Sequence, residues 1–174
     1  NIDLKRLNNL IEPLEKLKNT IGMESVKKSL VGQILFQLQN LSGDGNDMLH
    51  TVIQGPPGVG KTMLGRILGE IYYKMGVIKG NTPKRDRRGR IIKNNEDYIF
   101  RIVKRADLIG KYLGHTAAKT QEVIDSCRGG VLFIDEAYSL GNAEGRDSFS
   151  KECIDTLNQN LSENKNNLLC IIAG

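Results

Sequence analysis

Residues 55–62 read GPPGVGKT, which fits the pattern GxxxxGK[ST]. An apolar run over residues 50–54 precedes this stretch and an amphipathic run over residues 61–75 follows it, which predicts a strand and then a helix. A glycine-rich loop between a strand and a helix is the setting in which this pattern binds phosphate. The residues assigned to this candidate phosphate loop are Gly55, Pro56, Pro57, Gly58, Val59, Gly60, Lys61, Thr62 and Met63.

The chemistry of this loop suits a nucleotide. Its glycines let the backbone turn so that successive N–H groups face phosphate oxygens. The predicted helix adds the positive end of its dipole at the same point. We expect Lys61 to reach the β- and γ-phosphates, as a solvent-facing charge that only phosphate satisfies, and the Thr62 hydroxyl to be a ligand for Mg²⁺.

A second motif, VLFIDE at residues 131–136, supplies acids downstream of the loop. Its four apolar residues predict a buried strand that places Asp135 at the carboxyl end, where parallel sheets bind ligands. We expect Asp135 to hold Mg²⁺ through its water shell and Glu136 to orient and deprotonate an attacking water. Two adjacent acids favour hydrolysis over group transfer. A small nucleotide kinase is compatible with the loop but needs no glutamate there, and the Asn-Lys-x-Asp motif of a GTPase is absent.

Short apolar runs alternate with longer helical patterns from residue 50 onward. Alternation of this kind predicts a mainly parallel sheet covered on both faces, and hence an α/β fold of three αβα layers. Two further helical patterns precede it, over residues 4–17 and over residues 26–41. Pro13 interrupts the first pattern, which is therefore either two short pieces or a helix that restarts with Pro13 near its first turn. The predicted strands are residues 50–54, 98–103, 131–134 and 168–173, and the predicted helices between them are residues 61–75, 116–128 and 149–161.

Composition narrows the class of protein. The chain has 174 residues, of which 39% are hydrophobic and 26% charged, and this excludes a disordered charged tail. No apolar run approaches the ~20 residues of a membrane helix, and no secretory leader opens the sequence. Three scattered cysteines, Cys127, Cys153 and Cys170, argue against a disulfide framework or a zinc site. We therefore expect a cytoplasmic or otherwise reducing compartment.

The net charge of +5 comes from one segment. Residues 79–93 (KGNTPKRDRRGRIIK) hold seven basic residues and one acid, so the rest of the chain is close to neutral. Such a cluster is either a solvated insertion or a contact for a polyanion. No aromatic residue interleaves with it, so base stacking has no support and nucleic acid is not the expected partner.

Two further stretches, residues 107–120 (DLIGKYLGHTAAKT) and residues 129–138 (GGVLFIDEAY), stand beside the phosphate loop. On these residues the chain resembles the AAA+ ATPases, and within them the CbbX/CfxQ group of red-type Rubisco activases and stage V sporulation protein K relatives. The similarity runs from Ile21 to Gly174. The resemblance implies an AAA+ large subdomain over residues 21–174, preceded by a helical lead-in over residues 1–20. The lid subdomain would lie beyond the strand that ends at Ala173.

The resemblance also implies a function. Members of this group bind ATP and Mg²⁺ and couple hydrolysis to remodelling of a protein client, in a ring that we expect to be a homo-hexamer. Lys111, Tyr112 and Leu113 match the pore loop that grips a polypeptide in the centre of such a ring. Ile21 and Gly22 match the adenine contact of many AAA+ proteins, although Ile-Gly could also be a plain helix break.

Two other functions stay open at this stage. One is a nucleotide-gated assembly or binding module in which hydrolysis is incidental, and the other is a nucleic-acid translocase that uses residues 79–93. The family's sensor, arginine finger and lid would follow Gly174, and Arg146 is not assigned as a finger. We therefore expect the 174-residue chain alone to bind ATP weakly, to be largely monomeric and to be nearly inactive.

Overall fold

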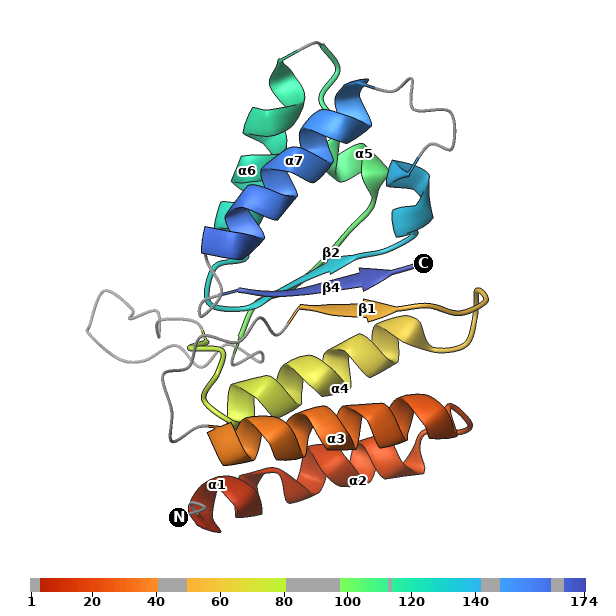
Figure 1. Ribbon diagram of the computed structural model, residues 1–174, viewed down its shortest axis with the longest axis vertical. Coiled ribbons are helices and arrows are strands. Elements are labelled where there is room, and N and C mark those ends of the chain that lie inside the picture. The colour runs from red at the N-terminus through yellow and green to blue at the C-terminus, as the bar shows by residue number, and fades with distance from the viewer. Residues whose placement is uncertain (1–3, 41–49, 81–97, 113, 142–147, 164–167) are drawn as a thin grey trace, which may run out of the picture.

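The computed structural model describes residues 4–112, 114–141, 148–163 and 168–174, with residues 41–49 and 81–97 left out of the first range. Most of the basic segment, as well as Leu113 and Arg146, therefore lies outside the described residues. Figure 1 shows a central sheet, with α6 and α7 on one face and α4 on the other, followed by α3 and α2. No helix in the described ranges is long and apolar enough to cross a membrane.

Among the described residues, four strands form the sheet, and all their pairings are parallel. They are β1 (Thr51–Ile53), β2 (Phe100–Val103), β3 (Val131–Ile134) and β4 (Leu169–Ala173), and their order is β1-β4-β3-β2. A strand buried on both faces consists of consecutive apolar residues, which explains why β3 has the bounds that the sequence predicts. The predicted α/β class with a parallel sheet between helical layers is confirmed.

The helices follow the predicted pattern, with two additions. The additions are α5 (Arg105–Leu108) and the 3₁₀-helix η1 (Ala137–Leu140), each four residues long and therefore too short to show a helical period. Pro13 does not break α2, because it lies in the first turn, where its missing N–H is not needed. The remaining helices are α1 (Leu4–Asn9), α2 (Ile11–Asn19), α3 (Glu24–Asn40), α4 (Lys61–Lys74), α6 (His115–Ser126) and α7 (Ser148–Glu163).

Alternate side chains of β3 point into two separate cores. Val131 and Phe133 pack with α2, α3 and α4, whereas Leu132 and Ile134 pack with α6 and α7. On the first side, Gly65 of α4 lies so close to the sheet that a Cβ there would be 2.6 Å from the Phe133 ring. The second core contains the three cysteines, all buried free thiols, and burial raises the pKa of Cys170 to about 12.

The N-terminal helices share the first core with the phosphate-loop helix. Leu10 and Leu17 are buried together with residues of α4. Four charges also connect α2 to α4: Glu12 and Glu70 each contact both Lys16 and Lys74, at 2.9–3.1 Å. Residues 4–20 thus form part of the same packed body, while their assignment as a separate lead-in remains a prediction.

This network predicts an acid-sensitive contribution to stability. Lys74 and then Lys16 hold the pKa of Glu12 at about 2, below its ordinary value of 4.5. Because the carboxylate is favoured in the folded state, its contribution is complete above about pH 4.5 and is lost as the pH falls toward about 2. We expect the difference in unfolding free energy between wild type and Glu12→Gln, measured by urea denaturation, to shrink over this window. Glu15→Gln, on the exposed face of α2, is the control; a difference that stayed constant with pH would contradict the assignment.

Candidate active site

The phosphate-loop candidate lies at the carboxyl edge of the sheet, between β1 and α4 (Figure 1). Its first residue is tied to the end of the neighbouring strand, because the Gly55 N–H donates to the Gly174 carbonyl at 2.9 Å. The Gly174 N–H in turn donates to Ile53 at 3.0 Å. The start of the loop is therefore fixed by the pairing of β1 with β4.

Glycine is required at two points of this loop. Gly58 and Gly60 have φ angles of 81° and 86°, in the left-handed region that other residues rarely adopt. Gly60 is also the N-cap of α4, and its carbonyl accepts the Leu64 N–H at 3.0 Å. The free N–H groups of the first helical turn and the positive end of the helix dipole therefore meet the loop at one place.

Lys61 contradicts one expectation from the sequence. The sequence predicts a solvent-facing ammonium that only phosphate satisfies. In the structure Lys61 Nζ already donates to the carbonyls of Gly55 at 2.6 Å and Pro56 at 3.1 Å. The loop wraps around the side chain, and its carbonyl lone pairs satisfy the half-buried ammonium. An anionic ligand must therefore displace these bonds or share the ammonium with them.

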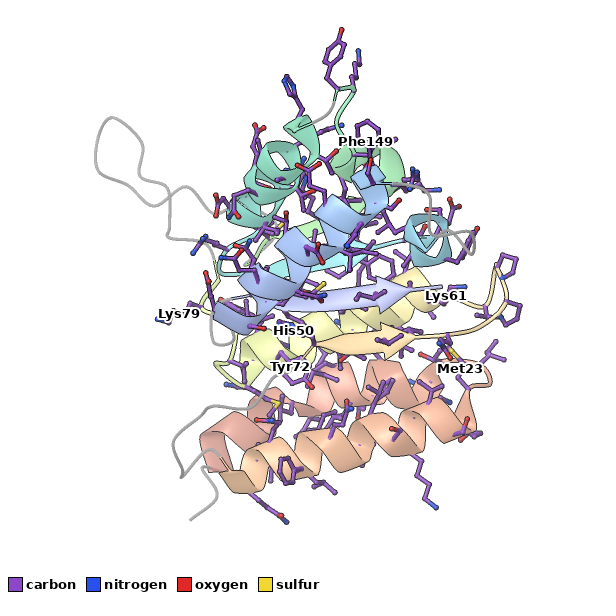
Figure 2. The ribbon with its side chains drawn as sticks, turned by 45° about the horizontal axis from the view of Figure 1, so that its top comes forward. Met23, His50, Lys61, Tyr72, Lys79 and Phe149 are labelled. Carbon is purple, nitrogen blue, oxygen red and sulfur yellow. The ribbon has the colours of Figure 1, made fainter. Side chains whose placement is uncertain are left out.

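The loop and the acidic motif meet in one cleft of about 470 Å³. Lys61 and Thr62 line it on one side, and Asp135 and Glu136 come from the end of β3 on the other. Figure 2 shows Lys61 at this edge of the sheet. Pro56, Val59 and Met63 are not among the lining residues, which are Gly55, Pro57, Gly58, Gly60, Lys61, Thr62, Asp135, Glu136, Tyr138 and Gly174.

The backbone differs at the two acids that follow β3. The Asp135 N–H donates to Val103 at 2.8 Å and so continues the pairing of β3 with β2. Glu136 has a φ of 53°, which is uncommon for a residue other than glycine, and its N–H donates to Asp135 Oδ1 at 3.0 Å. The chain thus turns sharply between two adjacent carboxylates.

Lys104 is a residue of this site that sequence reasoning missed. Its Nζ lies 2.9 Å from Glu136 Oε1, and both side chains are about half exposed. The hydrogen bond that the Lys104 ammonium donates to the Glu136 carboxylate raises the pKa of Lys104. The only sequence signal is a basic residue directly after a strand, since the contact depends on the register between β2 and β3. In this arrangement Lys104 occupies one oxygen of the Glu136 carboxylate and neutralises its charge.

Tyr138 is a second residue of this cleft to which the sequence analysis assigns no role. It lies in η1, lines the mouth of the cleft and is exposed. Its ring is near Gly174, since a Cβ built at that glycine would lie 4.0 Å from the ring. The sequence feature that points to Tyr138 is its place at the end of the motif GGVLFIDEAY.

The pore-loop candidate lies elsewhere, in the connection between α5 and α6, at the top of Figure 1. Lys111 and Tyr112 are exposed, and 69% of the tyrosine surface is accessible. The structure therefore does not bring this loop into the cleft. An exposed aromatic side chain in a loop, away from both cores, is available to a partner.

The adenine candidates lie in the turn between α2 and α3. Ile21 is 95% exposed, and Gly22 and Met23 both have positive φ angles, of 73° and 56°. Figure 2 places Met23 on the same side of the molecule as Lys61. Ile21 is not among the residues that line the cleft, and its contact with adenine remains a prediction.

One protein-family model matches most of this chain. The model of the ATPase family associated with various cellular activities (AAA) matches residues 51–174, which include the phosphate loop, both acids and all four strands. The chain belongs to this family. The AAA chain is therefore an α/β P-loop protein of the class expected from its motifs.

Relatives of the AAA chain carry the names of the CbbX/CfxQ group, which confirms the resemblance. A putative cfxQ-like protein of Acanthamoeba polyphaga mimivirus is 49% identical over the whole chain, which covers 39% of that protein. Stage V sporulation protein K of Bacillus subtilis is 34% identical over 95% of the chain and 48% of its own length. The chloroplastic ribulose bisphosphate carboxylase/oxygenase activase of Cyanidioschyzon merolae is 35% identical over 90% of the chain and 50% of its own length. The chain thus spans half or less of these relatives.

Solved structures show the same fold. The AAA domain of FIGL-1 has a TM-score of 0.57 at 21% identity, over 95% of this chain and 53% of that one. The same domain in complex with ADP has a TM-score of 0.56 at 22% identity, over 89% of this chain and 47% of that one. At this identity the likeness concerns the arrangement of helices and strands alone.

Proposed function

We propose that the AAA chain is the Mg²⁺-dependent, ATP-hydrolysing module of a ring-forming ATPase that remodels a protein client. The observation that carries this proposal is the single cleft in which Lys61 and Thr62 face Asp135 and Glu136. A basic loop at a helix N-terminus opposite two strand-end acids suits a nucleoside triphosphate with a bound metal. Because the chain spans half or less of its relatives, the ring and the client belong to the longer protein.

The proposed phosphate contacts use groups already aimed at the cleft. The N–H groups of the loop and of the first turn of α4 bind phosphate oxygens. Lys61 exchanges its bonds to Gly55 and Pro56 for bonds to the β- and γ-phosphates. The turn with Ile21 and Gly22 contacts the adenine ring.

The residues present also fit Mg²⁺. No group of three or more His, Cys, Asp or Glu side chains in the described ranges could hold a metal by itself. Mg²⁺ in nucleotide sites needs no such cage, since it keeps several waters and binds substrate phosphates. Thr62 and Asp135 line the same cleft and supply one hydroxyl and one carboxylate. The bound ion would neutralise charge on the β- and γ-phosphates.

Glu136 is the proposed general base. After its oxygen leaves Lys104, the carboxylate accepts a proton from the attacking water. The water oxygen bonds to the γ-phosphorus as the bond to the bridging oxygen breaks, and ADP and phosphate result. The Lys104–Glu136 pair favours a second candidate as well, a nucleotide-gated module, because it keeps the base engaged in the state that the structure describes.

Lys111, Tyr112 and Leu113 are proposed to contact the client, and Tyr112 provides the test. In the full-length protein, Tyr112→Ala should retain ATP binding, since it lies on a different loop from Lys61. It should lose most of the stimulation of ATP turnover by unfolded casein, which serves as the probe polypeptide. Stimulation is measured as a ratio to the turnover of the same variant without casein.

Phe36→Ala is the matched control, because Phe36 is also an exposed aromatic residue but lies on α3. We expect it to keep the wild-type ratio. Stimulation that survives Tyr112→Ala would remove the pore-loop role, whereas stimulation by DNA or RNA in a salt-dependent manner would favour a nucleic-acid translocase.

A further inference from the structure

The base of the loop between α5 and α6 is held against α6. The Gly110 N–H donates to Thr116 Oγ1 at 3.0 Å, and Lys119 Nζ donates to the carbonyls of Ile109 at 2.9 Å and Ala106 at 2.7 Å. A Cβ at Gly110 would lie 2.8 Å from the backbone of His115, so only glycine permits this approach. Because its base is fixed, the loop presents its exposed side chains from a defined position.

His115 closes the outer part of this loop. It is the first residue of α6, and its N–H donates to the Tyr112 carbonyl at 3.2 Å. The preceding Gly114 has a φ of 81°, in the left-handed region that residues other than glycine rarely adopt. This hydrogen bond therefore holds the backbone of Tyr112 against the first residue of α6.

The side chains of these two residues also meet. The ring centroids of Tyr112 and His115 are 5.6 Å apart, and the rings are inclined at 73°, which is an edge-to-face pair. Aromatic pairs favour this geometry because the positive edge of one ring faces the negative face of the other. The contact leaves Tyr112 69% exposed, so it orients the ring without burying it.

We infer that His115 is a positioning residue that holds the Tyr112 ring in the orientation that contacts a client polypeptide. The inference rests on the proposed function of this loop. A ring already restrained before the encounter loses less rotamer freedom when a polypeptide binds. His115 thus acts through Tyr112, and its replacement weakens client engagement by what one edge-to-face pair contributes, roughly two- to tenfold.

The test compares His115→Ala with His115→Phe in the full-length protein. We expect His115→Ala to raise the casein concentration that gives half-maximal stimulation by roughly two- to tenfold. His115→Phe keeps a ring at this position and should restore most of the wild-type value. Glu122→Ala, an exposed change further along α6, is the control and should match wild type.

A second measurement needs no client. In protein with ¹³C-labelled tyrosine, the Tyr112 ring signal is assigned by its loss in Tyr112→Phe. It should move in His115→Ala, because a neighbouring ring is removed, and should stay in place in Glu122→Ala. An unmoved Tyr112 signal in His115→Ala, or equal half-maximal concentrations for His115→Phe and His115→Ala, would overturn the inference.

These outcomes separate the inference from the proposed function. If Tyr112→Ala abolishes stimulation and His115→Ala matches wild type, the positioning role is wrong and the pore loop remains. If Tyr112→Ala has no effect on stimulation, the proposed function of the loop fails first.

Discussion

Lys61→Ala is expected to weaken ATP binding by roughly 100-fold or more. Hydrogen bonds to charged groups contribute about 1.5–3 kcal/mol each, and Lys61 is proposed to bind two phosphates. The bonds that Lys61 now makes to Gly55 and Pro56 must be given up or shared on binding, which keeps each new bond near the lower end of that range. Two such bonds together contribute about 3 kcal/mol, which corresponds to roughly 100-fold in affinity. Titration with a fluorescent ATP analogue measures the loss directly, and the shift in thermal unfolding on addition of ATP should disappear.

The fold should survive this change. The two carbonyls that Lys61 releases lie in a partly exposed loop, where water replaces the ammonium. Lys151→Ala, an exposed lysine on α7 across the sheet, is the control and should bind ATP as wild type does. ATP binding by Lys61→Ala at close to wild-type affinity would show that this loop is not the phosphate site.

Local patterns predicted the parts of the fold that local physics determines. The consecutive apolar residues of β3 gave its bounds, because a strand covered on both faces has no polar side to interrupt the pattern. The phosphate loop was also recognisable, since its glycines and its lysine act within one short segment. The short α5 and η1 were not predicted, because four residues do not complete a readable helical period.

The rest of the site depends on contacts between distant segments. Lys104 meets Glu136 only because β2 and β3 pair in register, with Val103 beside Ile134. The bonds from Lys61 to the loop carbonyls likewise follow from how the loop folds back, which the residue types alone do not show. Two contacts of the four-charge network, Lys16–Glu70 and Lys74–Glu12, join segments more than 50 residues apart, and no sequence pattern marks them.

Glu136→Gln should lower ATP turnover by roughly 10²- to 10⁴-fold, the usual contribution of a general base. ATP binding should persist, because glutamine keeps the shape of the side chain and Lys61 and Thr62 are unchanged. Turnover is followed by phosphate release in the full-length protein, beside direct measurement of ATP binding. Glu122→Gln, on the exposed face of α6, is the control for the loss of one carboxylate.

The Glu136→Gln change also removes the partner of Lys104, so the loss of the base must be separated from the loss of the ion pair. Lys104→Ala removes the pair and keeps the base, and its turnover should stay well above that of Glu136→Gln. The half-exposed pair contributes little to stability, so neither variant should unfold. If both variants lose turnover equally, the ion pair and not proton transfer carries the effect. If Glu136→Gln hydrolyses ATP within about twofold of wild type, Glu136 is not the base, and the nucleotide-gated module becomes the better account of this cleft.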